Sequence, residues 1–481
     1  MVDNGTKSKI VCTIGPASES KEVLEKMMEA GMDVARLNMS HEDHKNARKT
    51  FETIRSLDDT LPILFDLQGP KIRIGEVDGQ VDLTTGSEFI LSTEQFVGDV
   101  TRVSVSYDEL PQDVKVGSII ALNDGIVRLK VKAIENTEVI TEVTHGGPIS
   151  SRKGVNIPGI KLSAVVPTPE DLKDLDLAAE LEPDLIALSF VTGADDVRKL
   201  REVITSNGPE DAWIISKIEH TLAIKNFDEI LKESDGVMIA RGDLGIEVPI
   251  EDVPILQKDL IRRANIWAKP AIVATHMLES MIEELIPTRA EVSDVAHAIM
   301  ERADAVMLSG ETAVGQNPVS TVEMMERIVR RTEETITRED PLDITSPQRM
   351  IVEIIGNMTY NAVTLIPDKI GGVITSTRSG YTARWISKFR PPCQIFAVTP
   401  DERVSRRLRL LWGVFPLRYA EHLDSVDDIV KEATQVVYEK GLVDKDKDIV
   451  FTSGVKMIPG RTNVVGVFHV KDLIDRRILF S

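Results

Sequence analysis

Short apolar runs recur along the chain, and segments with helical spacing separate them. Eight runs stand out; seven end in polar or charged residues and one ends in Thr-Ile-Gly. Strands that are buried on both faces read as nearly continuous apolar runs, so we interpret the eight as parallel strands of βα units. In a closed barrel of eight such units, the carboxyl ends of the strands form one rim, where the reacting groups gather. The runs span residues 9–15, 34–40, 62–68, 185–190, 213–219, 237–243, 271–276 and 305–311.

The spacing of the runs predicts two further domains. Residues 70–165 carry turn residues at short intervals between alternating segments, which predicts a small antiparallel β domain inserted at the rim, where it can act as a lid. A helix over 319–335 leads into the proline-containing segment 340–347, which we take as a domain boundary. The remainder alternates helix and strand, with strands at 372–375, 394–399, 448–453 and 463–468. We therefore place the barrel at 1–69 and 166–340, the β lid at 70–165 and an α/β domain at 341–481.

Composition narrows the function classes for these 481 residues. The formal net charge of −20 argues against nucleic acid or an anionic membrane as the main partner. No run of eighteen apolar residues is present, and the first residues lack the apolar core of a secretory signal. Cys12 and Cys393 lie far apart in sequence, so we expect no disulfide and a cytoplasmic protein.

Lys217, Glu219 and Asp243 form the first candidate site. Residues two apart in a strand share a face, so Lys217 and Glu219 both point to one site, and Asp243 follows at the end of the next strand. Two carboxylates without a nearby His or Cys cluster suit a hard cation such as Mg²⁺ or Mn²⁺. The alternative is a buried ionic network that only closes the barrel.

Arginines add positive charge to the same rim. Arg36, Asn38 and Ser40 alternate along one strand face, and Asp66 and Arg73 flank the next strand end. Two arginines that converge with a lysine and a metal would form an electrostatic clamp for phosphate, as phosphoryl transfer requires. Alone, Arg36 would be an ordinary ion-pair partner.

Two more segments combine hydroxyl groups with a predicted helix start. Thr275 lies at a strand end where a helix can begin. Its hydroxyl could bind an anion or could simply cap the helix. We expect His276 to be a packed or polar rim residue. The segment 375–382 reads as a phosphate nest or as a turn with an N-cap. His41 and His44 lack the spacing of a zinc motif, so we expect a polar loop or helix start there.

The motifs together resemble those of the pyruvate kinase family, in order and over essentially the whole chain. The resemblance implies an α/β fold: a TIM (β/α)₈ barrel with an inserted β-barrel domain and a C-terminal α/β regulatory domain. It also implies transfer of the phosphoryl group of phosphoenolpyruvate to ADP, giving pyruvate and ATP in glycolysis. The similar segments are residues 9–18, 35–41, 66–73, 217–219, 240–245, 274–281, 287–296 and 306–313.

The resemblance assigns roles to individual residues by motif position. Glu219 and Asp243 would hold Mg²⁺ or Mn²⁺. The catalytic residues would be Lys217, Arg36, Arg73 and Thr275. Arg36, Lys217, Gly242, Asp243 and Thr275 would bind the substrate. Nucleotide would contact Asn38, His41, Arg73, Asp124 and Lys153.

One position departs from the K⁺-dependent members of the family. Asn38, Ser40 and Asp66 are present, but Leu67 occupies the position of a threonine and Lys71 that of a glutamate. An ammonium there could supply the charge that K⁺ otherwise provides and would repel a second cation. The combination is that of K⁺-independent members, so we expect that K⁺ is not required.

The resemblance also predicts regulation and assembly. An activating phosphorylated metabolite would bind its phosphate at Thr377, Arg378, Ser379, Gly380, Tyr381 and Thr382. Lys456 and Arg461 fall in the loop expected to cover it. A homotetramer is expected from the family.

Two other functions remain open from the residues alone. A metal-dependent lyase or aldolase acting on an oxo acid would also place carboxylates and an arginine at a barrel rim. The β lid, the second arginine and the lysine beside the metal site favour the kinase. A catalytically silent metabolite sensor that uses only the C-terminal domain is the third possibility, but the complete set of rim residues argues against it.

Overall fold

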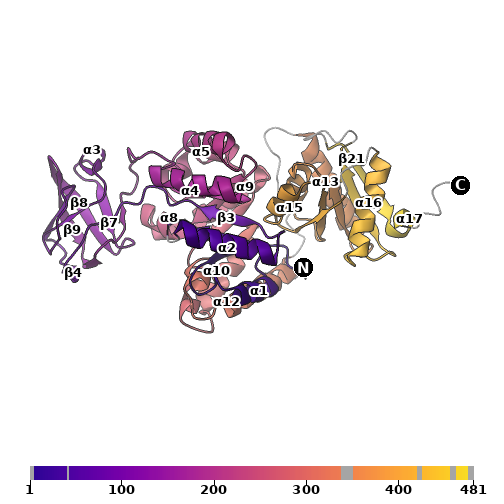
Figure 1. Cartoon of the computed structure of the whole chain (residues 1–481), viewed down its shortest axis with the longest axis horizontal. Helices are drawn as coiled ribbons and strands as arrows, with labels where there is room; N and C mark the ends of the chain where they lie inside the picture. Colours follow the sequence, from indigo (N-terminus) through magenta and orange to yellow (C-terminus); the bar gives the residue numbers. More distant parts are fainter. Residues whose placement is uncertain (1–4, 41–42, 337–349, 420–424, 455–461, 475–481) are drawn as a thin grey trace.

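The computed structural model describes residues 5–40, 43–336, 350–419, 425–454 and 462–474. Three bodies follow one another along its long axis (Figure 1). A β-rich body lies at one end, a barrel surrounded by helices lies in the centre, and an α/β body formed by the last part of the chain lies at the other end. The predicted boundary at 340–347 lies outside the described residues.

Eight parallel strands close into the central barrel, in the order β1-β16-β15-β14-β13-β12-β3-β2. Each strand overlaps one of the eight apolar runs, so this prediction is confirmed. The strands are β1 (Lys9–Ile14), β2 (Val34–Asn38), β3 (Ile63–Asp66), β12 (Leu185–Leu188), β13 (Trp213–Ile218), β14 (Gly236–Ala240), β15 (Ala271–Ala274) and β16 (Ala305–Leu308).

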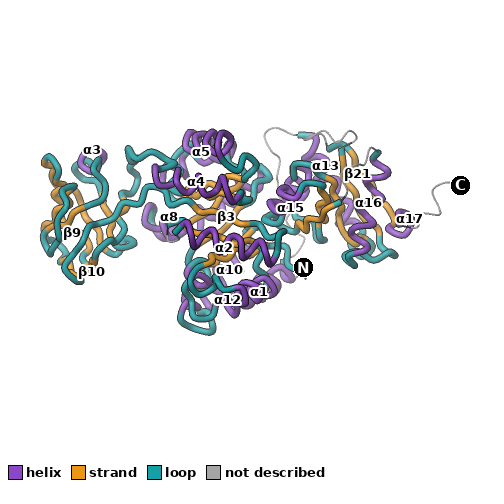
Figure 2. The backbone as a smooth tube through the Cα atoms, in the orientation of Figure 1, coloured by secondary structure: helices purple, strands orange, loops and turns teal. Residues whose placement is uncertain are grey.

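Helices surround the barrel strands (Figure 2). Several begin at side chains that satisfy the free N–H groups of a first turn. Thr168 and Asp171 form a capping box, and so do Thr288 and Glu291. The helices are α1 (Lys21–Ala30), α2 (His44–Leu57), α4 (Pro169–Leu181), α5 (Ala194–Asn207), α6 (Thr221–Lys225), α7 (Phe227–Glu233), α8 (Arg241–Glu247), α9 (Val253–Ile266), α10 (Arg289–Met300), α11 (Gly310–Ala313) and α12 (Pro318–Thr335), with 3₁₀ helices η1 (Ile250–Asp252) and η2 (Glu279–Ile282).

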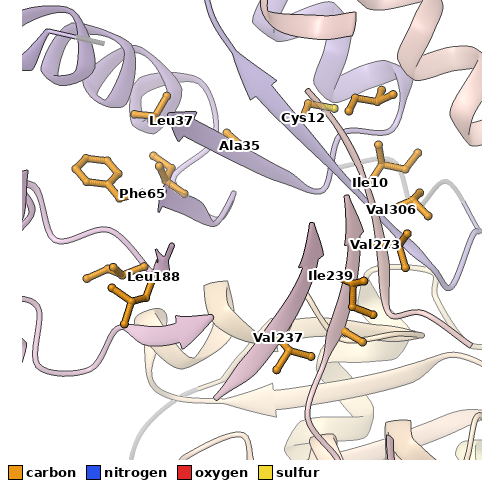
Figure 3. Close-up of a cluster of buried hydrophobic side chains, with 14 of the residues drawn as sticks. Ile10, Cys12, Ala35, Leu37, Phe65, Leu188, Val237, Ile239, Val273 and Val306 are labelled. Carbon is orange, nitrogen blue, oxygen red and sulfur yellow. The ribbon is translucent and has the colours of Figure 1, made fainter. Parts of the chain in front are cut away.

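The two faces of each barrel strand pack into different cores. Ile10 on β1 belongs to a cluster that includes Leu24 of α1, and therefore faces the helices (Figure 3). Its neighbour Val11 belongs to a second cluster, with Leu64 and Ile215 from other strands. Because side chains alternate along a strand, the barrel-strand members of this second cluster fill the barrel interior, and the cluster continues into the C-terminal body.

The β-rich body is the predicted insertion. It contains a six-stranded sheet, β11-β7-β8-β9-β5-β6, and a two-stranded sheet, β10-β4. Pairing is antiparallel as predicted, except that β5 and β6 are parallel. The elements are β4 (Gln80–Leu83), β5 (Glu88–Ser92), β6 (Arg102–Ser104), α3 (Leu110–Asp113), β7 (Ile119–Leu122), β8 (Val127–Glu135), β9 (Glu138–His145), β10 (Gly147–Ser150) and β11 (Val155–Asn156).

The C-terminal body is a five-stranded sheet, β19-β18-β17-β20-β21, with helices packed on it. The four predicted strands are present, and β19 is an additional one. Its Pro416 masks the pattern, but proline is tolerated because β19 is an edge strand. The elements are α13 (Ile351–Leu365), β17 (Ile370–Ser376), α14 (Tyr381–Lys388), β18 (Ile395–Thr399), α15 (Glu402–Leu408), β19 (Val414–Arg418), α16 (Val426–Glu439), β20 (Asp448–Ser453), β21 (Val464–His469) and α17 (Val470–Ile474).

Arginines from and beside α15 join this body to the barrel. Arg406 Nε lies 2.6 Å from Asp184 Oδ1, just before β12, and Arg409 Nη1 lies 3.1 Å from Asp58 Oδ2, just after α2. Arg55 also pairs with Asp184, at 2.5 Å. Asp184 precedes the amino end of β12, so the C-terminal body packs against the barrel end opposite the catalytic rim.

Two predictions about the chain as a whole can be checked. Cys12 and Cys393 are both free, as expected. Among the described residues, none of the helices has the length and apolarity needed to cross a bilayer.

Candidate active site

The interior faces of the barrel strands change from apolar to charged toward their carboxyl ends. Leu64 on β3 lies in the interior cluster, and Asp66 follows two positions later. Ile215 and Lys217 on β13 have the same relation. Residues two apart share a face of the strand, so the charged side chains continue the interior column and reach the mouth of the barrel.

Arg36 and Asp66 form a buried ion pair on neighbouring strands. Arg36 Nε donates to Asp66 Oδ2 at 2.7 Å, and Arg36 Nη1 donates to Thr13 Oγ1 at 2.8 Å. Burial alone would raise the pKa of Asp66, but the charges of Lys217 and Arg36 lower it below its usual value. Asp66 is therefore ionised and fixes the guanidinium at the rim.

Lys217 lies at the centre of this charged group. Its Nζ donates to Ser189 Oγ at 2.7 Å and lies 3.4 Å from Asp66 Oδ1 and from Glu219 Oε2. Burial opposes the charge, but Asp66 and Glu219 raise the pKa of Lys217 above its ordinary value. The site therefore holds a permanent ammonium.

Glu219 and Asp243 fit the predicted divalent-cation site. Glu219 Oε1 accepts the Phe190 N–H at 2.6 Å, while the buried Oε2 accepts no hydrogen bond within the described ranges. Burial raises the pKa of Glu219 to about 7, against the effect of Lys217, and burial together with the charge of Asp124 raises the pKa of Asp243. Two buried carboxylates whose pKa stays raised although Lys217 is near, one with an oxygen that accepts no hydrogen bond within the described ranges, suit a hard cation.

No set of three or more His, Cys, Asp or Glu side chains arranged to hold a metal occurs among the described residues. If Glu219 and Asp243 hold a divalent cation, they would supply only two of its ligands, and the remaining positions of a six-coordinate ion would be open to substrate and water.

The predicted helix start at Thr275 is wrong. Thr275 and His276 have φ values of 70° and 54°, so this turn cannot continue into a helix, and the 3₁₀ helix η2 begins only at Glu279. The helix start at the rim belongs instead to α8, where the Gly242 N–H donates to Thr275 Oγ1 at 2.7 Å. Arg241 fixes the turn, because its Nη2 donates to the Thr275 carbonyl at 2.7 Å.

Phe190, Thr275 and His276, at this rim, are among the described residues with positive φ. Thr275 is β-branched, a residue type that rarely adopts positive φ. Phe190, which donates its N–H to Glu219, has φ of 54°. Such conformations persist where surrounding contacts over-determine them, typically at functional sites.

The histidines near the rim behave as expected. His276 leaves 63% of its side chain exposed, as a polar rim residue does. His44 begins α2, and its Nε2 lies 2.7 Å from Asp174 Oδ1. His41 lies outside the described residues.

The lid carries three of the predicted nucleotide contacts. Arg73 Nη1 donates to the Arg152 carbonyl at 3.1 Å, so its guanidinium bonds the lid and not the barrel cluster. The Lys153 carbonyl accepts the Ile74 N–H at 2.9 Å. Asp124, in a tight turn with φ of 54°, lies close enough to Asp243 to affect its pKa.

Lys71 lies between the lid and the barrel cluster. Burial, together with the positive charges of Arg73 and Lys217, lowers its pKa to about 8, against the effect of Asp66 and Asp243. In the described part of the chain its ammonium forms no hydrogen bond or ion pair that would hold it elsewhere.

Among the other members of the predicted monovalent-cation pocket, Leu67 is the one without a side-chain oxygen. Asn38 Oδ1 accepts the Ser40 N–H at 3.3 Å. The Leu67 side chain is buried in the core between strands and helices, and its carbonyl accepts the Ser189 hydroxyl at 2.7 Å. Leu67 therefore presents no side-chain oxygen to a cation.

The predicted effector loop leads from β17 into α14. Gly380, with φ of 81°, donates its N–H to Thr377 Oγ1 at 3.0 Å, and Thr382 bonds the Thr462 hydroxyl. Arg378 and Ser379 are exposed. Lys456 and Arg461 lie outside the described residues. Three buried hydroxyl oxygens at the nearby strand ends have no hydrogen-bond partner within the described ranges: those of Thr375, Ser376 and Thr452.

Sequence reasoning missed several residues of the site. Ser189 and Thr13 orient Lys217 and Arg36, and the Phe190 N–H holds Glu219. Ser189 and Thr13 lie two positions after the interior residues Ala187 and Val11, so the i, i+2 rule could have found them. The role of the Phe190 N–H has no signal in the side-chain pattern.

Comparison with known proteins gives one family. Residues 5–322 match the family model "Pyruvate kinase, barrel domain", and residues 357–468 match "Pyruvate kinase, alpha/beta domain". A pyruvate kinase of Bacillus licheniformis is 43% identical over 98% of this chain and 81% of its own length, and one of Clostridium perfringens is 39% identical over 96% and 99%. The crystal structure of a pyruvate kinase from Cryptosporidium parvum superposes with a TM-score of 0.91 at 34% identity, covering 98% of each chain. The chain therefore belongs to the pyruvate kinase family of phosphotransferases.

Proposed function

We propose that the chain transfers the phosphoryl group of phosphoenolpyruvate to ADP, giving pyruvate and ATP, as a cytoplasmic step of glycolysis. One observation carries the proposal: Lys217 Nζ lies 3.4 Å from both Asp66 and Glu219, with Arg36 bonded to the same Asp66. Although the protein is acidic, Lys217 and Arg36 thus place positive charge beside Glu219 and Asp243, two carboxylates suited to a metal. The names and coverage of the relatives support the same reaction.

The reaction suits this charge distribution. The bond between phosphorus and the enol oxygen breaks, a bond to a terminal ADP oxygen forms, and the enolate takes a proton at C3. Lys217 stabilises negative charge on the phosphoryl group and on the enolate, and Arg36 with Arg73 binds the phosphoryl oxygens. Arg73 would have to turn from the Arg152 carbonyl to the substrate as the lid closes.

Glu219 and Asp243 would hold Mg²⁺ or Mn²⁺, which supplies charge neutralisation at the substrate carboxylate and phosphoryl oxygens. The Asp243 N–H would bind that carboxylate, together with the Gly242 N–H once it is released from the Thr275 hydroxyl to which it donates. The Thr275 hydroxyl, 2.7 Å from the Gly242 nitrogen, lies beside the same anion and near the path of the proton.

The lid would bring Asp124 and Lys153 to the nucleotide, which would also contact Asn38 and His41. We propose residues 70–165 as this lid, 1–69 with 166–340 as the barrel, and 341–481 as the regulatory domain. Closure would exclude water and strengthen the electrostatic interactions in the site.

We also propose that the enzyme does not require K⁺. The Lys71 ammonium lies near Asp66 and Asp243, where its charge lowers the pKa of Asp243. Leu67 contributes no side-chain oxygen, and a monovalent cation in this pocket would be repelled by Lys71.

A phosphorylated activator would bind at 377–382. The Gly380 turn, the start of α14 and the three unpartnered hydroxyls at the adjacent strand ends support an anion site there. A homotetramer is supported by exposed apolar side chains on two bodies: Leu365 of α13 is 80% exposed and Ile286, before α10, is 73% exposed.

The test is a coupled assay of pyruvate formation, with and without ADP. A kinase forms pyruvate only when ADP is present, whereas a lyase or aldolase acting on an oxo acid forms it without ADP. The assay should compare the rate in K⁺ with the rate in a bulky organic cation, and each should be measured with and without a panel of phosphorylated metabolites. Absence of ADP-dependent pyruvate formation would overturn the proposal.

A further inference from the structure

The carboxylate of Glu247, the last residue of α8, lies where three segments of the molecule meet. The side chain is only 4% exposed, although it stands at the edge of the rim. Its Oε2 accepts the Thr221 N–H at 3.1 Å and the Thr221 hydroxyl at 3.0 Å. Thr221 follows β13, the strand of Lys217 and Glu219, so Glu247 ties this strand end to the helix that carries Asp243.

The third segment is the chain returning from the lid to the barrel. Oε2 of Glu247 also accepts the Gly159 N–H, at 3.1 Å. The adjacent Ile160 carbonyl lies 3.1 Å from His220 Nε2. His220 Nδ1 accepts the Leu222 N–H at 3.0 Å, so the ring proton is on Nε2 and His220 donates to Ile160.

The lid also comes close to α8 at a second place. A β-carbon added to Gly125 would lie 3.5 Å from a side-chain carbon of Ile246, the neighbour of Glu247. Gly125 belongs to the lid turn that contains Asp124. Helix α8 thus bonds the return segment of the lid and lies near the turn that faces Asp243, and Figure 1 shows α8 on the lid side of the barrel.

We propose that Glu247 is a positioning residue that anchors the hinge of the lid to the segment after β13, which bears Glu219, and to helix α8, which bears Asp243. It touches none of the groups assigned to substrate or metal. It sets the angle from which the lid closes, and therefore the position of Asp124 and Lys153 at the nucleotide. The role in catalysis rests on the proposed function, whereas the anchoring of the hinge does not.

The test compares Glu247→Ala and Glu247→Gln with Glu291→Ala as a matched control. Glu291 also accepts several short hydrogen bonds from backbone and hydroxyl groups, those of Ser280 and Thr288, but it lies away from the lid. Hydrogen exchange of residues 157–162, measured on the whole protein without substrates, reports the hinge directly. We expect exchange to be roughly 10-fold faster in Glu247→Ala and intermediate in Glu247→Gln, which keeps one acceptor oxygen. The Glu291→Ala control should match the wild type in this segment.

Kinetics then show whether the anchor serves catalysis. Glu247→Ala should raise the KM for ADP by roughly 10-fold and change the KM for phosphoenolpyruvate less than threefold, because the lid supplies nucleotide contacts. Glu247→Gln should recover most of the loss.

If Glu247→Ala does not fold, both measurements are made on Glu247→Gln alone. Wild-type exchange at 157–162 in the folded variants would overturn the anchor; faster exchange with unchanged KM values would overturn its role in closure. An inactive wild type would refute the proposed function and leave the exchange result standing.

Discussion

Replacing Lys217 by methionine tests the centre of the proposed site. The substitution keeps an unbranched chain and removes the ammonium that lies 3.4 Å from Asp66 and Glu219. At this distance and an effective dielectric of about 20, two unit charges attract by about 5 kcal/mol. Lys217 already interacts with Asp66 and Glu219 before the reaction. Only part of its electrostatic effect therefore stabilises the negative charge that develops in the transition state. Loss of one preorganised donor costs roughly 2.7–4 kcal/mol in the transition state, which lowers kcat by roughly 10²–10³-fold.

Folding should change much less than turnover. Asp66 keeps its 2.7 Å bond to Arg36, and Glu219, with a pKa of about 7, can take up a proton when the ammonium is lost. We therefore expect the loss of stability to stay below the roughly 3–5 kcal/mol that breaking a buried ion pair costs, with a fall of a few degrees in Tm.

The matched control is Lys269→Met, at another buried lysine of the same barrel. Lys269 Nζ donates to the carbonyls of Leu231 and Lys232, at 2.5 and 2.9 Å, and to that of Ser234, at the end of α7. This variant should lower Tm and leave kcat within about threefold of the wild type, because no site residue contacts Lys269. Circular dichroism and the coupled pyruvate assay measure both quantities. Wild-type turnover in a folded Lys217→Met variant would refute the role of Lys217.

Three further predictions follow from the monovalent pocket, the effector loop and the domain interface. Replacing K⁺ by a bulky organic cation at fixed ionic strength should leave the rate unchanged, because the Lys71 ammonium would supply the charge of the ion; a strong rise with K⁺ would contradict this. Ser379→Asp combined with Thr382→Ala should abolish activation by phosphorylated metabolites and spare the basal rate, and unchanged activation curves would argue against the loop. Arg406→Met should lower the free energy of unfolding by about 1–3 kcal/mol, measured in urea, since Asp184 loses one of its two arginines and keeps Arg55 and the Ile63 N–H; an unshifted midpoint would show that the ion pair adds nothing.

The barrel and the charges at its mouth were predictable because both follow from local patterns. Apolar runs identified all eight strands, and the two-residue period of a strand placed Lys217 and Glu219 on one face. Strand β19 escaped because Pro416 interrupts its pattern, and only the sheet order shows that it is an edge strand.

The finer geometry depends on tertiary contacts. The turn at Thr275 looked like a helix start, since hydroxyl residues favour that position, but the bond from Arg241 to its carbonyl accompanies a different backbone conformation. The positive φ of Phe190 likewise has no signature in the side-chain sequence. The direction of Arg73 depends on where the lid stands relative to the barrel, which no local pattern specifies.

Strand β12 joins the floor of the barrel to its mouth within a few residues. Asp184, which pairs with Arg406 of the C-terminal body, lies just before the strand. Ser189, which bonds Lys217, and Phe190, whose N–H donates to Glu219, lie just after it. At about 3.3 Å per residue, Asp184 and Ser189 lie roughly 17 Å apart along an extended strand that is paired on both sides. A slip of this strand by a fraction of an ångström would displace both ends together. The packing of the C-terminal body against the barrel therefore affects the positions of Ser189 and Phe190, and through them those of Lys217 and Glu219.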